Sequence, residues 1–245
     1  MFLRMPQPFL RQAGTLALTG LACILAASAQ AQVSGSAGVV SDYMYRGISL
    51  SSGKPAARLS IDVDGAQGWF AGGQVVSGQL APQSHRNAQW LGYAGYAERL
   101  QSGWSWEAGL SAYAFHAAPD WNFREVFVGM AFENYSARLH YSPDYLGFRE
   151  RTLYAELNGG AALAAGWRYF WRGGYLAAPG NADSSRAEGR VGIGTGFEGW
   201  QMQLSLDAVR RRGRVAGTGT GYGSSASETS SKVHSKLVLG LARSF

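Results

Sequence analysis

The sequence predicts an all-β protein, a single antiparallel up-and-down transmembrane β-barrel of about 12 strands. Three observations predict it. Apolar and polar residues alternate with a period of two along most of the chain, as they do in strands with one apolar and one polar face. After the N-terminal region, no apolar run approaches the roughly 20 residues that a membrane helix needs. Tight turns alternate with longer loops, which is the layout of bacterial outer-membrane barrels.

The composition separates the chain from other protein classes. Charged residues make up only 16% of the chain and aromatic residues 13%, and 34 of the 245 residues are glycine. An ordinary soluble domain is richer in charge and poorer in glycine and aromatic side chains. The formal net charge of +6 is too small to indicate nucleic-acid binding, so no nucleic-acid partner is expected.

The N-terminal residues 1–31 have the pattern of a cleaved secretory signal peptide. Arg4 and Arg11 form its basic region, residues 16–27 its apolar region, and residues 29–31 an A-x-A cleavage site. An exported chain that forms a barrel is expected in the bacterial outer membrane.

The remaining residues, 32–245, are expected to form the barrel as one domain. Cys23 is the only cysteine and lies in the signal segment, so the mature chain has no disulfide or thiol chemistry. The four histidines lack a metal-binding spacing such as H-x-x-x-H. We therefore expect no metal site and no cofactor.

Twelve segments with period-two alternation follow one another along the mature chain. An even number of antiparallel strands closes a barrel and leaves both termini on the side of the short turns. The connections on the other side are mostly longer, and we expect them to be the outer loops. The segments are 33–46, 56–65, 68–79, 88–100, 103–116, 122–133, 135–143, 150–159, 166–177, 186–197, 200–211 and 233–245, and the outer loops are 47–55, 80–87, 117–121, 144–149, 178–185 and 212–232.

The two faces of the predicted strands differ in polarity. Leu204 and Leu206 alternate with Ser205 and Asp207, which suits a lipid-facing row beside a lumen-facing row. Aromatic residues gather near the segment ends, where a membrane-interface girdle places them. A soluble lipocalin-like barrel has the same period with its faces inverted, and alternation alone does not distinguish the two.

The last strand favours the membrane barrel. Leu237, Leu239, Leu241 and the final Phe245 share one face. This terminus looks like the signal that outer-membrane barrel assembly machinery recognises in its substrates. The machinery is therefore an expected partner.

The stretch 41–56 joins the first two segments. Its alternation predicts that the first strand continues to Arg46, with Tyr43 and Tyr45 in the outer aromatic girdle. The first outer loop motif that follows consists of Gly47, Ser49, Lys54 and Pro55.

Charged residues on the polar faces form a candidate constriction. Because they point into a narrow lumen, they can select solutes by charge and size. The opposing interpretation is that acids and bases mainly neutralise one another inside the barrel. The predicted constriction residues are Asp42, Arg46, Arg58, Asp62, Arg138, His140, Arg168 and Arg172.

His140 is the strongest candidate for catalysis. It shares the polar face of its strand with Arg138, and nearby segments offer Ser142, Glu125 and Glu156. No G-x-S-x-G elbow is present. A structural, hydrogen-bonding histidine is the more common case, and we expect no enzymatic activity.

The widest gap, from Arg210 to Lys232, begins with the basic stretch Arg210-Arg211-Arg212-Gly213-Arg214 and continues through the predicted loop 212–232. This stretch has the charge to contact anionic lipopolysaccharide. The alternative is a solvated strand end with a flexible linker.

The chain resembles the proteobacterial family of conserved hypothetical proteins known as Gcw_chp. Family members carry a phrase similar to Ser41-Asp42-Tyr43-Met44-Tyr45-Arg46-Gly47-Ile48-Ser49 followed by Lys54-Pro55-Ala56. They also carry a phrase similar to Tyr141-Ser142-Pro143-Asp144-Tyr145 and end in an aromatic strand. Tyr45, where Phe is common, and the long 212–232 segment depart from the family pattern. The resemblance implies an outer-membrane barrel of unknown function and supplies no reaction.

The function that these features favour is a narrow channel or facilitator for small polar solutes. A non-conducting structural or surface-interaction barrel that acts through its outer loops is the first alternative. An outer-membrane lipid or ester hydrolase is the less favoured one. The expected partners are outer-membrane lipid and lipopolysaccharide, the assembly machinery and a small polar solute, and the oligomeric state stays open.

Overall fold

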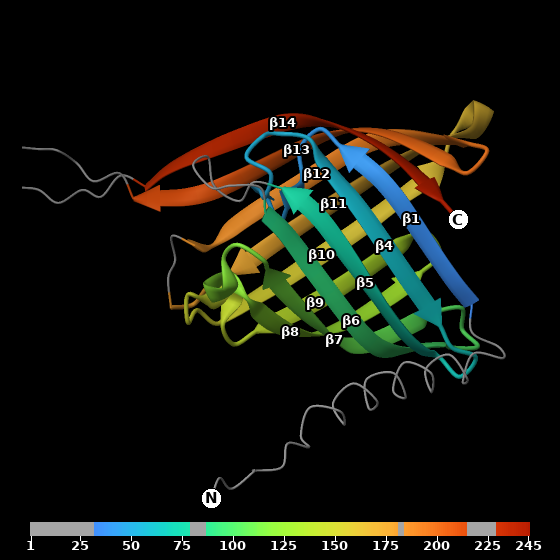
Figure 1. The fold of residues 1–245 in the computed structure, drawn as a ribbon, viewed down its shortest axis with the longest axis horizontal. Coiled ribbons are helices and arrows are strands. Elements are labelled where there is room, and N and C mark those ends of the chain that lie inside the picture. Colours follow the sequence, from blue (N-terminus) through green and yellow to red (C-terminus); the bar gives the residue numbers. More distant parts are fainter. Residues whose placement is uncertain (1–31, 79–86, 181–183, 215–228) are drawn as a thin grey trace, which may run out of the picture.

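The computed structural model describes residues 32–78, 87–180, 184–214 and 229–245. Within them, twelve long antiparallel strands form a closed barrel, as the sequence predicts (Figure 1). In the order in which they pair, the strands are β1 (Gln32–Val40), β4 (Ala56–Asp64), β5 (Trp69–Gly78), β6 (Asn87–Arg99), β7 (Ser105–Phe115), β8 (Phe123–Phe132), β9 (Tyr135–Ser142), β10 (Thr152–Ala162), β11 (Trp167–Ala177), β12 (Arg186–Phe197), β13 (Trp200–Arg214) and β14 (Thr229–Ser244).

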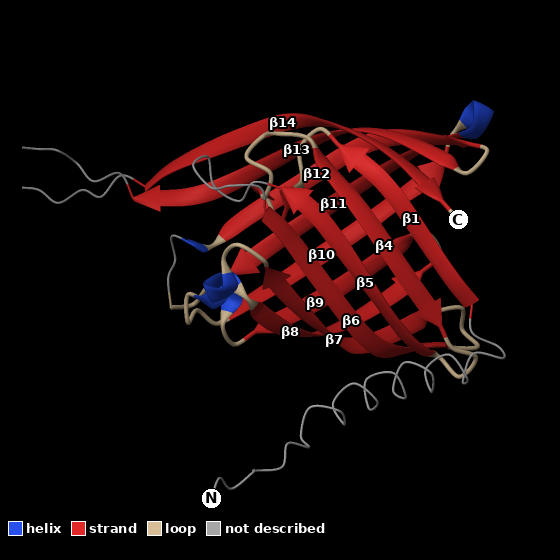
Figure 2. Ribbon diagram, in the orientation of Figure 1, coloured by secondary structure: helices blue, strands red, loops and turns tan. Residues whose placement is uncertain are grey.

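The connections differ between the two ends of the barrel (Figure 2). One end, here called the turn end, carries connections such as Glu198-Gly199, in which both residues have a positive φ, as a type I′ hairpin turn requires. The other end, here called the loop end, carries the longer connections and the short helical turns η1 (Pro119–Trp121) and η2 (Tyr145–Gly147). A third helical turn, η3 (Ala164–Gly166), lies at the turn end.

The barrel closes between its first and last strands. β1 pairs antiparallel with β14 from Ser36 opposite Ser244 to Val40 opposite Gly240. Phe245 extends this ladder, since its backbone N–H and C=O both bond to Gly35 at 3.0 Å. The start of β1 and the end of β14 therefore lie together at the turn end (Figure 1).

The two faces of the wall point as the alternation predicts. Leu206 is 47% exposed on the outside, whereas Asp207 beside it is 6% exposed and faces the lumen. Leu237, Leu239, Leu241 and Phe245 all lie on the exposed outer face. The outside is therefore apolar and the lumen polar, which is the arrangement of a membrane barrel. No helix among the described residues is long and apolar enough to cross a membrane.

Three predicted strand boundaries are wrong. The first strand ends at Val40 instead of Arg46, for reasons given below. β13 continues to Arg214 and β14 starts at Thr229, because the two strands stay paired beyond the predicted ends. The basic stretch from Arg210 to Arg214 thus belongs to a strand. The segment 215–228 and the predicted signal peptide, 1–31, lie outside the described residues.

The hydrophobic core of the protein lies inside the barrel at the loop end. Lumen-facing aromatic side chains of β7, β8 and β10 pack there against the chain between β1 and β4 and against η2. Tyr113 and Phe123 stack with ring centroids 4.3 Å apart. The cluster consists of Leu50, Tyr113, Phe115, Phe123, Tyr145, Leu146, Tyr154 and Leu176.

Candidate functional site

Residues 41–55 fold back into the barrel, and we call them the inward loop. They contain a small separate hairpin, β2 (Met44–Tyr45) paired with β3 (Ile48–Ser49). Its two turn residues, Arg46 and Gly47, have φ values of 46° and 74°. Positive φ at both positions defines a type I′ turn, which a glycine at the second position favours. The chain already bends at Ser41 and Asp42, directly after Val40, so the predicted first strand ends there and residues 44–49 form this hairpin instead.

The inward loop corrects the predicted place of two tyrosines. Tyr45 packs inside the barrel, with its ring centroid 5.7 Å from that of Tyr113. Tyr43 accepts a hydrogen bond of 3.3 Å from the lumen-facing Gln74. Neither side chain belongs to an outer aromatic girdle. The prediction was wrong because a hairpin folded into the lumen has the same alternation as a strand in the wall.

Burial raises the pKa of Tyr43. A hydrogen bond from Gln74 and the charges of Arg58, Arg172 and Arg190 act in the opposite direction. The phenol therefore lies where the inward loop meets arginines from three strands of the wall.

A buried ion pair fixes the tip of the inward loop. The guanidinium of Arg46 donates to both carboxylate oxygens of Glu125 on β8, at 2.5 and 2.7 Å. Arg46 and Glu125 are 5% and 2% exposed. His140 on β9 also approaches this carboxylate, with Nδ1 at 3.3 Å from Oε2. A bidentate arginine–carboxylate pair is among the strongest polar contacts in proteins, provided that both groups stay paired.

Further contacts hold Arg46 in place. Its guanidinium carbon lies 4.2 Å from the ring centroid of Tyr154, at cation–π distance. Its carbonyl oxygen accepts a 2.7 Å hydrogen bond from Arg186 on β12. Arg186 also donates to the hydroxyl of Tyr145, at 3.0 Å. The tip is therefore fixed from β8, β10 and β12 at once.

Asp42 anchors the base of the inward loop. Its carboxylate accepts hydrogen bonds from Ser49 at 2.5 Å and Ser51 at 2.7 Å, and it pairs with Lys236 of β14 at 2.5 Å. Burial raises the pKa of Asp42, but the bonds from Lys236, Ser49 and Ser51 outweigh burial and lower the pKa below its ordinary value. The folded loop therefore holds Asp42 ionised.

Close backbone packing completes the inward loop. A Cβ at Gly47 would lie 2.6 Å from Cγ2 of Val209 on β13. A Cβ at Gly78, the last residue of β5, would lie 2.7 Å from the carbonyl oxygen of Leu50. Both glycines allow the loop to touch the wall directly. The inward loop thus contacts β5 and β13 as well as β8, β12 and β14, and it therefore extends across the lumen.

The predicted first outer loop motif therefore divides into two parts. Gly47 is buried at the tip and Ser49 is partly buried against Asp42. Lys54 and Pro55 are exposed where the chain returns to β4. Gly47 and Ser49 therefore belong to the packed part of the inward loop, and Lys54 and Pro55 to its exposed end.

Toward the turn end the lumen is more open and its charged groups are more exposed. Arg138 pairs with Glu107 at 2.6 Å, but their side chains are 39% and 26% exposed. A cavity of about 380 Å³ lies beside this pair and reaches Arg172. A second cavity, of about 460 Å³, is lined by Arg168, Arg172 and Arg190.

The predicted constriction residues thus fall into two groups. Asp42, Arg46 and His140 are buried with the inward loop. Those more accessible to solvent and on the lumen face of the strands are Arg58, Asp62, Arg138, Arg168 and Arg172. Arg190, Glu107 and Asp207 are not among the predicted constriction residues, although the alternation of their strands already placed them on the polar face.

The surroundings of His140 are those of a packing residue. Its ring lies 5.7 Å from that of Phe127 and 5.8 Å from that of Tyr154, between centroids. Ser142 is fully buried, and its hydroxyl donates a hydrogen bond to the carbonyl oxygen of Arg124. A nucleophilic serine needs a neighbouring base and access to substrate. Ser142 and His140 do not form such an arrangement.

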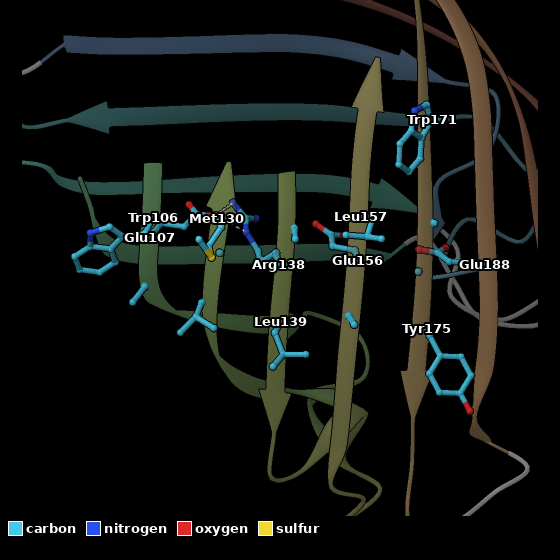
Figure 3. Close-up of a pocket in the computed structure, with 17 residues that line it drawn as sticks. Trp106, Glu107, Met130, Arg138, Leu139, Glu156, Leu157, Trp171, Tyr175 and Glu188 are labelled. Atoms are coloured by element: carbon cyan, nitrogen blue, oxygen red, sulfur yellow. Dashed lines mark hydrogen bonds and ion pairs between the residues drawn. The ribbon is translucent and has the colours of Figure 1, made fainter. Parts of the chain in front are cut away.

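The outer wall carries an apolar depression of about 910 Å³ across β7 to β11 (Figure 3). Met130, Leu157 and Tyr175 line it and are more than half exposed on the outside of the barrel. Figure 3 also shows Glu107 on β7 and Arg138 on β9, joined by dashed lines, beside the outward-facing Trp106 and Leu139 of the same two strands. The depression is therefore mainly a feature of the apolar outer surface, and the lumen-facing Glu107, Arg138, Glu156 and Glu188 also border it.

The barrel is similar to solved porins. It superposes on the KdgM porin with a TM-score of 0.53 at 13% sequence identity, over 87% of this chain and 99% of the porin. A KdgM porin in complex with disordered oligogalacturonate gives a TM-score of 0.52 at 14% identity, over 87% and 99% of the two chains. The NanC porin gives 0.50 at 13% identity, over 86% and 99%. At such identities the likeness shows the fold alone.

Curated proteins offer no match to this sequence. The Gcw_chp family model, described as a bacterial protein of unknown function, matches residues 25–184, which is more than half of the chain, and the chain therefore belongs to this family.

Proposed function

We propose that this protein is a narrow outer-membrane channel for small polar solutes, with the inward loop as its narrowest part. The observation that carries the proposal is the lumen toward the turn end. Charged side chains there border cavities of about 380 and 460 Å³ instead of a packed apolar core. Rings of charged side chains select permeating solutes by charge and size.

Two further observations support a channel. The fold is that of the KdgM and NanC porins. Twelve strands also lie between the small barrels whose interior is filled by side chains and the 16-stranded porins with an aqueous channel. A barrel of 12 strands is therefore expected to contain a channel narrower than that of the 16-stranded porins.

The test is a swelling assay on liposomes that contain the refolded barrel. Swelling should occur with glycerol and with monosaccharides, and should fall steeply with larger oligosaccharides, because the inward loop narrows the lumen. Liposomes with a heat-denatured sample provide the baseline. Liposomes that stay impermeable to glycerol contradict the proposal.

The second candidate is a non-conducting barrel. The observation in its favour is the loop end, where Leu50, Phe115 and Tyr154 are no more than 3% exposed and the inward loop reaches several strands. A barrel filled in this way can serve as a rigid support for its outer loops. It predicts no swelling with any solute, whether or not the inward loop is shortened.

The remaining assignments follow from the channel proposal. The apolar outer wall faces membrane lipid, the loop end faces the cell exterior and its lipopolysaccharide, and the turn end faces the periplasm. The outward row Leu237, Leu239, Leu241 and Phe245 is the segment offered to the assembly machinery. No reaction is assigned, because the network around His140 is that of a structural residue.

A further inference from the structure

Four lumen-facing residues form a row across neighbouring strands. In the antiparallel register, Asn158 of β10 lies opposite Arg172 of β11, Arg172 lies opposite Arg190 of β12, and Arg190 lies opposite Asp207 of β13. Two arginines are thus direct cross-strand neighbours. Like charges in this relation destabilise a sheet.

The positive charge of this row is only partly compensated. Nε of Arg190 donates to Oδ1 of Asp207 at 2.6 Å. Nε of Arg172 donates instead to the neutral amide oxygen of Asn158, at 3.1 Å. Among the described carboxylates, none forms an ion pair with Arg172 or with Arg168, which lies on the same face of β11. Two guanidinium groups therefore face the lumen without an acid.

Beside these arginines the wall has a glycine, and an aromatic ring covers it. Phe170 stands between Arg168 and Arg172 on the lumen face of β11, and its ring leans over Gly192 of β12, where a side chain would collide with it. The cavity of about 460 Å³ opens in front of these residues. Its volume lies within the range of small-molecule sites, roughly 300–1,000 Å³.

We propose that this arginine pocket, formed by Asn158, Arg168, Phe170, Arg172 and Arg190, binds the carboxylate of a small organic solute. The proposal rests on the channel function and names its solute class. A planar guanidinium matches a carboxylate with two parallel hydrogen bonds. The ring of Phe170 gives the apolar part of the solute a flat surface. A bound carboxylate also relieves the repulsion between Arg172 and Arg190.

The experiment is titration calorimetry on the refolded barrel in detergent, at about 0.15 M salt, where charges more than roughly 8 Å apart are screened. Glucuronate and glucose are the probes, since they share a ring and differ by the carboxylate. Inorganic phosphate tests for an anion site without organic preference. We expect binding of glucuronate and none of glucose or phosphate in the same concentration range.

Two variants localise the site. Arg172→Gln should weaken glucuronate binding about tenfold or more, as expected for a lost charged hydrogen bond. Arg99→Gln removes the same charge from an exposed arginine at the end of β6, one that does not line this cavity, and should change the affinity less than about twofold. Heat-modifiable gel mobility confirms folding, and Arg168→Gln replaces Arg172→Gln if the latter does not refold.

Three results overturn the proposal: glucose or phosphate that binds as tightly as glucuronate, no binding of glucuronate, or equal losses in Arg172→Gln and Arg99→Gln. Failure of the channel looks different. If the liposomes are impermeable but the barrel still binds glucuronate, the channel proposal is contradicted and the arginine pocket is not. Permeable liposomes without glucuronate binding contradict the pocket alone.

Discussion

The two ends of the lumen use the same residue types in opposite ways. At the loop end, Arg46 and Glu125 are almost fully buried and bond to each other through both carboxylate oxygens. Toward the turn end, Arg138 and Glu107 pair at a similar distance but remain partly exposed. Burial determines how much such an ion pair contributes to the stability of the barrel. Removing one partner of a buried pair leaves the other charge buried and unpaired, which lowers the free energy of unfolding strongly. Water screens exposed pairs, so they contribute little to that free energy.

This difference separates structure from selection. The loop end is a small protein core inside a barrel, in which charges fix one conformation of the inward loop. In the proposed channel, the arginines toward the turn end, among them Arg168 and Arg172, are the groups that a solute meets. Substitutions should therefore change stability and pore size at the loop end, and solute affinity toward the turn end.

The largest expected effect is that of Glu125→Gln. The substitution leaves Arg46 buried without a counter-charge, which costs about 3–5 kcal/mol. Urea unfolding of the barrel in lipid vesicles, followed by tryptophan fluorescence, measures the loss. A loss below about 1 kcal/mol is the value expected of an exposed pair and would remove the distinction between the two ends.

Gly47→Ala should have the next largest effect. Its φ of 74° disfavours any side chain, and the added Cβ would lie 2.6 Å from Val209. Gly166 in a turn at the opposite end is the matched control, since its φ is 76° and a Cβ there meets nothing within 4 Å. Both alanine variants pay a strain of about 1–2 kcal/mol. Only Gly47→Ala should lose more than this and also change the conductance, so equal behaviour in both assays would contradict a packed loop tip.

A smaller, pH-dependent effect is expected at Asp42. Because the folded state lowers the pKa of Asp42, the ionised carboxylate adds stability above its unfolded pKa of about 3.9 and loses this contribution as the pH falls through the folded pKa. The partner Lys236 is 43% exposed, so the contribution should be about 1 kcal/mol or less. Unfolding between roughly pH 6 and 3 measures it. Asp42→Asn should be less stable at the upper pH and should lose less on acidification; a parallel loss in both proteins would contradict the assignment.

The smallest expected effect is that of Glu107→Gln. Its partner Arg138 is 39% exposed, so loss of the pair should cost about 0–1 kcal/mol in the same urea assay. The inward loop should be unaffected, and the conductance of the variant should match that of the wild type apart from ion selectivity. A loss as large as that of Glu125→Gln would show that both ends are equally rigid.

The alternation of the sequence was sufficient to predict the barrel wall. Leu206 and Asp207 point to opposite faces because a strand has a period of two, and the wall has no other way to arrange them. The strand bounds therefore agree with the predicted segments within a few residues, except at the end of β1, the end of β13 and the start of β14. Membership of the Gcw_chp family was also predictable, because residues 41–56 carry its most distinctive phrase.

The inward loop was not predictable from that phrase. Tyr43 and Tyr45 alternate with polar residues whether the chain continues as wall or folds inward. The direction depends on contacts with Glu125, Val209 and Lys236, which are distant in sequence. The adjacent Arg-Gly pair at 46 and 47 was the one local sign of a turn. The arginine pocket was hidden for a similar reason, since Arg172 and Arg190 meet only through the register of two strands.

The central claim is that the inward loop narrows the lumen while the turn end stays open, and single-channel conductance tests it most directly. Residues 43–52 are replaced by a short Gly-Ser linker, and the variant is compared with the wild type in planar bilayers after gel mobility has confirmed that both are folded. We predict a small conductance for the wild type and a several-fold larger one for the variant, because the lumen behind the loop is polar and hollow. Equal conductances, or silence in both proteins, would contradict the claim.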